Sequence, residues 1–165
     1  MISSGNYTEF SRKVELFRSS DQDILYVIGD SGAGKTSAAL EYIKENGNNH
    51  GVLYSVLPLT PTLKTFGTEL LSRFDIPSQK HINTNQIIER VVMGFKTKGT
   101  KLLIIDDFQR VLVDHKVYSE EFISFINILS GISEVKIVLL GLPEIRRFSG
   151  RREVFELNQM IIASS

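Results

Sequence analysis

The segment GDSGAGKT at residues 29–36 combines residue types that can hold a phosphate chain. It fits the pattern G-x-x-x-x-G-K-[ST], in which the glycines let successive backbone N–H groups face the phosphates. Lys35 adds a positive charge that can reach the outer phosphates, and the Thr36 hydroxyl is a suitable ligand for Mg²⁺. We expect phosphate binding by the residues that form this loop and open the next helix: Gly29, Asp30, Ser31, Gly32, Ala33, Gly34, Lys35, Thr36 and Ser37.

The alternative is a glycine-rich turn without a ligand. Against it stands the context of the motif, because an apolar run at 23–28 precedes the loop and good helix formers follow at 35–46. A strand before the loop and a helix after it are what phosphate binding requires, since the helix N-terminus also attracts negative charge.

Two carboxylates follow a second apolar run, LLIIDD at residues 102–107. Asp106 is predicted to hold Mg²⁺ together with Thr36, because carboxylate and hydroxyl oxygens suit that ion. Asp107 occupies the position at which many ATPases place a Glu that polarises the attacking water, which predicts a catalytic role. Asp is one methylene shorter than Glu, so we expect slow hydrolysis; a helix cap or a loop charge is the alternative for Asp107.

Four arginines precede the last apolar run: Arg146, Arg147, Arg151 and Arg152. They are open to three interpretations. They form a solvated basic turn, they supply an arginine finger that stabilises charge on the γ-phosphate of a neighbouring subunit, or they contact the DNA backbone.

Apolar runs and helical spacing alternate along the chain. Strands are predicted at 23–28, 51–57, 101–108, 135–141 and 153–158, and helices at 35–46, 60–75, 83–99, 119–131 and, as a short one, 142–150. This alternation predicts an α/β fold in which a five-stranded parallel sheet is covered on both faces. Ligands of such sheets bind at the carboxyl ends of the strands, where the glycine-rich loop and the Asp pair both fall.

The composition suits one compact domain over residues 1–165, with 42% hydrophobic and 23% charged residues. Because 19 basic residues balance 19 acidic ones, any contact with nucleic acid needs a local patch. Lys64, Lys96, Lys98 and Lys101 are candidates for a basic stripe, which a solvated face would explain equally well.

Several classes of site and location are disfavoured by the sequence. The absence of cysteine excludes disulfides, thiolate metal sites and cysteine nucleophiles. His50, His81 and His115 lie in predicted loops without metal-ligand spacing. No apolar run approaches the roughly 20 residues of a membrane helix, and the N-terminus lacks the apolar core of a secretory signal. We therefore expect a soluble cytoplasmic protein.

With these motifs placed, the chain resembles the AAA+ ATPases, in particular the compact group of ExeA/GspA-like proteins and TniB/TnsC/MuB-type transposition regulators. The resemblance runs from about residue 11 to 158 and rests on GDSGAGKT, LLIIDDFQRV, KIVLLGLPEIRR and the final VFEL. It implies a three-layer P-loop NTPase fold that binds ATP and Mg²⁺ and hydrolyses ATP.

The resemblance also implies partners. Subunits would assemble as a ring or filament on double-stranded DNA and recruit a transposase or targeting factor. Arg151 or Arg152 would act as the finger in trans, with Arg146 and Arg147 as further candidates, beside catalytic Lys35 and Asp107.

Three departures from that group stand out. Leu142 replaces the polar sensor that usually follows the fourth strand, and the acidic pair is Asp-Asp instead of Asp-Glu. The third is the lack of room after the fifth strand for the helical lid. These departures predict a low hydrolysis rate more than a loss of nucleotide binding.

Three functions stay open at this point. The first is an ATP-dependent regulator of DNA transposition. The second is a STAND-type nucleotide switch in a signalling or defence protein, which the Asp-Asp strand end also fits. The third is a small-molecule kinase, which would need an acceptor pocket and a basic lid.

Overall fold

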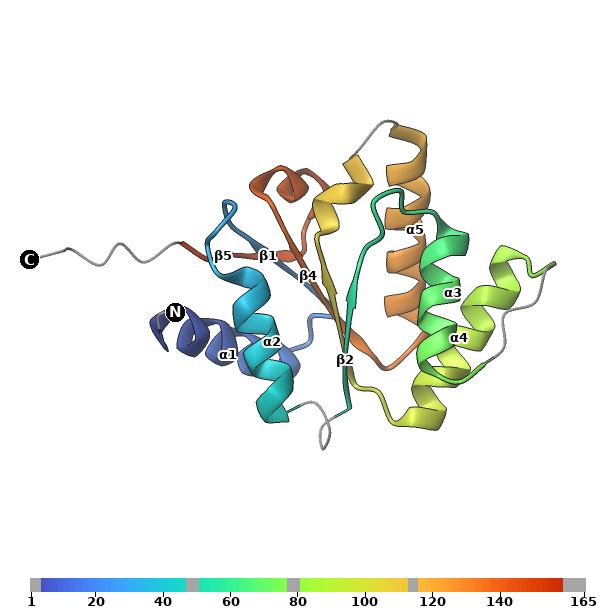
Figure 1. The fold of residues 1–165 in the computed structure, drawn as a ribbon, viewed down its shortest axis with the longest axis horizontal. Helices are drawn as coiled ribbons and strands as arrows, with labels where there is room; N and C mark the ends of the chain where they lie inside the picture. The colour runs from blue at the N-terminus through green and yellow to red at the C-terminus, as the bar shows by residue number, and fades with distance from the viewer. Residues whose placement is uncertain (1–3, 47–50, 77–80, 113–115, 159–165) are drawn as a thin grey trace, which may run out of the picture.

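The computed structural model describes residues 4–46, 51–76, 81–112 and 116–158, and in them five strands form one parallel sheet (Figure 1). The strands are β1 (Ile24–Ile28), β2 (Val52–Val56), β3 (Leu102–Asp106), β4 (Lys136–Gly141) and β5 (Glu153–Glu156). Their order across the sheet is β2-β3-β4-β1-β5. The expected five-stranded parallel sheet is confirmed, and each strand lies within its predicted run.

The three central strands are apolar because helices cover both of their faces. Every residue of β1 and β3 is buried, as is all of β4 after Lys136. Near-continuous apolar strands are typical of parallel sheets between helical layers. Complete burial of one Leu or Ile side chain stabilises the fold by about 1.5–3 kcal/mol, so these strands contribute strongly to its stability.

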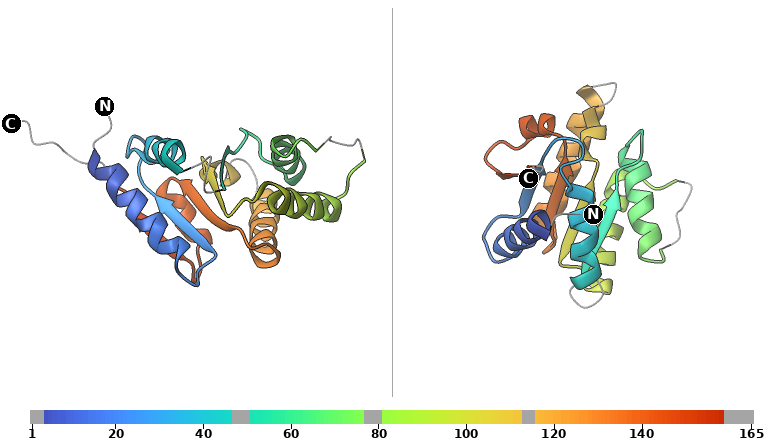
Figure 2. Two further views of the ribbon diagram at one scale, coloured as in Figure 1. Left: turned by 90° about the horizontal axis from the view of Figure 1, so that it is seen from below. Right: turned by 60° about the vertical axis from the view of Figure 1, so that its left-hand side comes forward.

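The helices form two outer layers (Figures 1 and 2). They are α1 (Ser4–Arg18), α2 (Lys35–Asn46), α3 (Leu63–Arg73), α4 (Thr84–Lys98) and α5 (Lys116–Ile132). One apolar cluster joins α1 and α2 to one face of the sheet, and a larger one joins α3, α4 and α5 to the other. The expected three-layer arrangement is thereby confirmed.

Helix α1 is an element that the sequence patterns above did not predict. Its buried residues Phe10, Val14 and Phe17 are spaced by four and three positions, which is a helical signal. Phe10 packs edge to face on Tyr42 of α2, with ring centroids 6.1 Å apart. This contact fixes α1 beside the helix that follows the glycine-rich loop.

Smaller differences concern helix ends and short helices. Helix α5 begins at Lys116, three residues before the expected start at 119. The short helix expected at 142–150 is the 3₁₀ helix η2 (Pro143–Phe148), and a second 3₁₀ helix, η1 (Phe108–Leu112), follows β3 unpredicted. Among the described residues, no helix is both long enough and apolar enough to cross a membrane.

Candidate functional site

A cavity of about 320 Å³ lies at the carboxyl ends of the central strands. Strand β4 separates β1 from β3, so the loop after β1 and the acidic end of β3 face each other across the end of β4. The cavity is lined by Ser31, Gly32, Gly34, Lys35, Thr36, Ser37, Asp106, Asp107, Gln109 and Leu142. The fold thus brings the predicted phosphate-binding loop and the predicted acidic pair to one site.

The loop between β1 and α2 has a backbone that its small residues permit. Gly32 and Gly34 have φ angles of 84° and 91°, a region that residues with a side chain rarely adopt. Inside the loop the Ala33 N–H donates to the Asp30 carbonyl at 3.0 Å. The Asn6 side chain of α1 donates to the Ala33 carbonyl at 2.8 Å, so α1 fixes the loop from outside.

Lys35 opens α2 and lines the cavity. Its ammonium group donates to the carbonyls of Gly29, at 2.6 Å, and Asp30, at 3.0 Å. An ammonium has three donors, so one is left for a phosphate oxygen. Burial lowers the pKa of Lys35, while Asp106, Asp30 and Asp107 act in the opposite direction. These carboxylates favour the charged form that phosphate binding requires.

Asp106 is buried and accepts three hydrogen bonds. The Thr36 hydroxyl donates to its Oδ2 at 2.7 Å, the Tyr54 hydroxyl donates to the same oxygen at 2.6 Å, and the Asp107 N–H donates to Oδ1 at 2.8 Å. Burial, followed by the bond to Asp106, raises the pKa of Tyr54 above its ordinary value, so Tyr54 remains a donor. The sequence did not point to Tyr54, because its contact with Asp106 depends on the pairing of β2 with β3.

This arrangement fits Mg²⁺. Thr36 and Asp106 supply two oxygen donors that border the cavity, and Mg²⁺ typically takes one or two protein oxygens, with phosphate and water completing its shell. Within the described ranges there is no group of three or more His, Cys, Asp or Glu residues that could hold a metal ion.

Asp107 has an unusual backbone at the edge of the cavity. Its φ is 56°, a left-handed conformation that Asp and Asn adopt more readily than other side-chain residues. Its Oδ1 lies 3.4 Å from Nε2 of Gln109, and its Oδ2 lies 3.4 Å from the guanidinium of Arg110. Arg110 in turn donates to the carbonyl of Leu57. Gln109 and Arg110, both in η1, therefore contact one oxygen each of the Asp107 carboxylate.

Leu142 lies at the end of β4 and lines the cavity, as its position in the sequence predicts. Its side chain is apolar, but its N–H lies 3.3 Å from Oε1 of Gln109, to which it donates. Gln109 was also missed in the sequence, because nothing in LLIIDDFQRV shows that this side chain turns back toward the strand ends.

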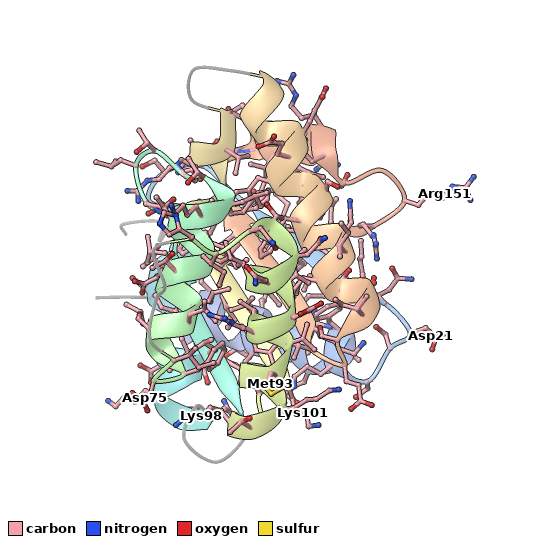
Figure 3. All side chains as sticks on the ribbon, turned by 90° about the vertical axis from the view of Figure 1, so that its right-hand side faces the viewer. Asp21, Asp75, Met93, Lys98, Lys101 and Arg151 are labelled. Carbon is pink, nitrogen blue, oxygen red and sulfur yellow. The ribbon has the colours of Figure 1, made fainter. Side chains whose placement is uncertain are left out.

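Arg151 and Arg152 lie just before β5, at the amino ends of the parallel strands, whereas the cavity lies at their carboxyl ends. Strand β5 pairs in parallel with β1, and Arg152 forms an ion pair with Asp23, which directly precedes β1. Arg151 extends outward from the turn between η2 and β5 (Figure 3). The fold does not bring either arginine into the cavity of its own chain, and their action in trans stays a prediction.

Arg146 and Arg147 belong to η2, which starts from the carboxyl end of β4. Arg146 lies 3.9 Å from the carboxylate of Glu156 at the end of β5, and Arg147 stacks over the Phe148 ring at 5.6 Å. Neither lines the cavity.

The expected basic stripe does not form as one surface. Three of its lysines, Lys96, Lys98 and Lys101, gather where α4 ends, and Figure 3 shows Lys98 and Lys101 at that end, with Lys98 beside Asp75. Lys98 pairs with Asp75 at 3.4 Å and Lys101 with Glu134 at 3.9 Å, so part of their charge is neutralised.

Lys64 is the exception, since it lies in the first turn of α3. Helices α3 and α4 run parallel, because Gly67 packs on Ile87 and Phe74 packs on Gly94. Lys64 is therefore at the opposite end of this helix pair from the other lysines. Of the three histidines, His81 is exposed, and His50 and His115 lie outside the described residues.

A protein-family model described as "AAA domain" matches residues 18–148. No curated protein matches the chain in sequence. The match spans the glycine-rich loop, the acidic pair and Leu142, and so covers the whole lining of the cavity.

Three solved structures illustrate the structural similarity. ORC from Drosophila bound to DNA has 17% identity and a TM-score of 0.66, over 95% of this chain and 46% of that chain. Cdc6p from Pyrobaculum aerophilum has 12% identity and a TM-score of 0.64, over 93% and 44%. A Walker-type ATPase of Pyrococcus abyssi has 14% identity and a TM-score of 0.64, over 92% and 52%. The chain spans about half the length of these structures, and at such identities the similarity concerns the fold.

Proposed function

The chain belongs to the AAA domain family, whose model covers most of its length, and on that premise we propose that it is a slow ATPase whose nucleotide state controls assembly on double-stranded DNA. ATP with Mg²⁺ binds in the cavity at the ends of β1, β3 and β4. Subunits carrying ATP associate with one another and with DNA, and those carrying ADP separate.

One observation carries the nucleotide site. The Thr36 hydroxyl and the Asp106 carboxylate are 2.7 Å apart, and the Lys35 ammonium is held at the same loop. A pair of oxygen ligands beside a cation is the arrangement that Mg²⁺ and a triphosphate need.

In the proposed reaction a water molecule attacks the γ-phosphorus in line with the bond to ADP. A new P–O bond forms, the bridging bond to the β-phosphate breaks, and ADP leaves with the electron pair of that bond. The Asp107 carboxylate accepts the proton of the water and releases it to solvent. The loop N–H groups, Lys35 and an arginine of the neighbouring subunit stabilise the charge that develops on the phosphate, and an Mg²⁺ ion held by Thr36 and Asp106 would supply further positive charge there.

Slow turnover is supported by the two sequence departures that line the cavity. Asp107, which lines the cavity, has a shorter side chain than the Glu found at this position in related ATPases. Leu142 brings no polar side chain to the end of β4.

The DNA part of the proposal is supported by similarity to other proteins. The ORC structure similar to this chain is bound to DNA. The KIVLLGLPEIRR segment is similar to transposition regulators, which favours recruitment of a transposase or targeting factor as the purpose of assembly.

Anisotropy of a fluorescent DNA duplex tests the proposal, measured with a non-hydrolysable ATP analogue, with ADP and without nucleotide. Light scattering of the same mixtures reports assembly. We expect tight binding and large particles only with the ATP analogue, and neither in the Lys35→Ala variant. DNA binding that is equal in all three nucleotide states would contradict nucleotide control.

A further inference from the structure

Gln109 lines the cavity but belongs neither to the phosphate-binding loop nor to the acidic pair. It lies in η1, two residues after Asp107, and its side chain lines the cavity. Its carboxamide bridges two strand ends: Nε2 lies 3.4 Å from Oδ1 of Asp107, and Oε1 accepts the N–H of Leu142 at 3.3 Å.

The neighbouring residues leave room for this bridge. A Cβ atom at Gly141, the last residue of β4, would lie 3.1 Å from Oε1 of Gln109 and 2.8 Å from Cδ1 of Ile145. Any side chain there would press on the carboxamide. Glycine at 141 therefore lets the carboxamide lie directly against the end of β4.

The left-handed backbone of Asp107 supports the same interpretation. Asp107, with φ at 56°, lies between the end of β3 and the start of η1, the helix whose Gln109 lines the cavity. Strained residues of this kind concentrate at functional sites. Arg110 holds the other carboxylate oxygen, so the two contacts together limit rotation of the Asp107 side chain.

We propose that Gln109 is the positioning residue that replaces the polar group absent at Leu142: it ties the Asp107 carboxylate to the end of β4 and thereby orients it toward the attacking water. This inference rests on the proposed ATPase function. Gln109 acts through Asp107, so its loss lowers the rate of hydrolysis and leaves nucleotide binding intact.

The test compares the parent with Gln109→Leu, which keeps the bulk of the side chain and removes both polar contacts. We expect kcat to fall about tenfold, a part of the roughly 100- to 10,000-fold that a positioned general base contributes. Affinity for a fluorescent ATP analogue should change by less than about twofold, or about 0.4 kcal/mol. Gln22→Leu, at an exposed glutamine between α1 and β1, is the matched control and should match the parent.

A double-mutant cycle with Asp107→Asn separates positioning from packing. If Gln109 acts through Asp107, the double variant turns over no more slowly than Asp107→Asn alone. Rate losses that multiply, or a Gln109→Leu variant as fast as the parent, overturn the inference. If Gln109→Leu does not fold, as judged by thermal melting, Gln109→Asn cannot span both contacts and must show the same loss of kcat.

Phosphate release by the parent protein distinguishes failure of the proposed ATPase function from failure of the proposed role of Gln109. A parent that binds ATP but releases no phosphate, alone or with DNA, overturns the ATPase function, and the role of Gln109 falls with it. A parent that hydrolyses ATP while Gln109→Leu matches it overturns only the role of Gln109.

Discussion

Tyr54 donates a hydrogen bond of 2.6 Å to the Oδ2 atom of Asp106, the oxygen that also accepts the Thr36 hydroxyl. The bond crosses from β2 to β3, where Tyr54 and Asp106 are offset by two positions in the parallel register. Tyr54 thereby orients a carboxylate that we assign to the Mg²⁺ site, without itself lining the cavity.

Tyr54→Phe removes this bond and keeps the ring. We expect the Mg²⁺ concentration for half-maximal binding of the ATP analogue to rise about tenfold, because residues that orient a metal ligand affect metal affinity to that degree. A Mg²⁺ titration with the fluorescent analogue measures it. Tyr7→Phe, at a tyrosine that bonds to Glu45 away from the cavity, is the control.

Lys35→Ala should abolish tight nucleotide binding. A charge-assisted hydrogen bond contributes about 1.5–3 kcal/mol, so we expect affinity to fall by about 10- to 100-fold or more. The increase in melting temperature on addition of ATP and Mg²⁺ should disappear with it. Lys44→Ala, in the exposed last turn of α2, should behave as the parent. Equal ATP affinity in Lys35→Ala and the parent would show that the phosphate site is wrongly assigned.

Asp107→Asn should slow hydrolysis without weakening nucleotide binding. Asn tolerates the left-handed backbone at φ 56° and cannot accept a proton, so the fold is kept while the base is lost. We expect kcat to fall about 100-fold, within the range that general-base catalysis provides. Phosphate release under saturating ATP measures this. An unchanged kcat would mean that Asp107 is a charged loop residue without a catalytic role.

The arginines before β5 are expected to act on a neighbouring subunit. Neither Arg151→Ala nor Lys35→Ala should hydrolyse ATP well alone, but mixing the two proteins should restore part of the activity. In mixed assemblies an intact phosphate site meets an intact arginine of its neighbour. No rescue at any mixing ratio, with assembly confirmed by light scattering, argues against Arg151.

Arg152→Ala needs a separate interpretation, because Arg152 pairs with Asp23 in its own chain. Its thermal stability must be measured beside its activity. Asp23→Ala breaks the same ion pair and leaves the arginine in place, so it should lower stability alike and spare trans activity.

The sequence alone was enough to predict the residues of the phosphate-binding loop and the order of the strands and helices around it. Both depend on residues that are close together along the chain. A contiguous motif specifies a loop whose residues are covalently adjacent, and a run of apolar residues specifies a strand buried between two layers. The periodic spacing of Phe10, Val14 and Phe17 would also have revealed α1.

Only the tertiary structure decided which strands are neighbours, and with that which side chains complete the site. Strand order places β4 between β1 and β3, so the cavity lies over Leu142, and pairing of β2 with β3 brings Tyr54 to Asp106. The left-handed backbone at Asp107 precedes η1, and Gln109 of η1 accepts the N–H of Leu142 after β4. These contacts join residues from different elements, and their geometry depends on packing and backbone angles that a linear pattern does not encode.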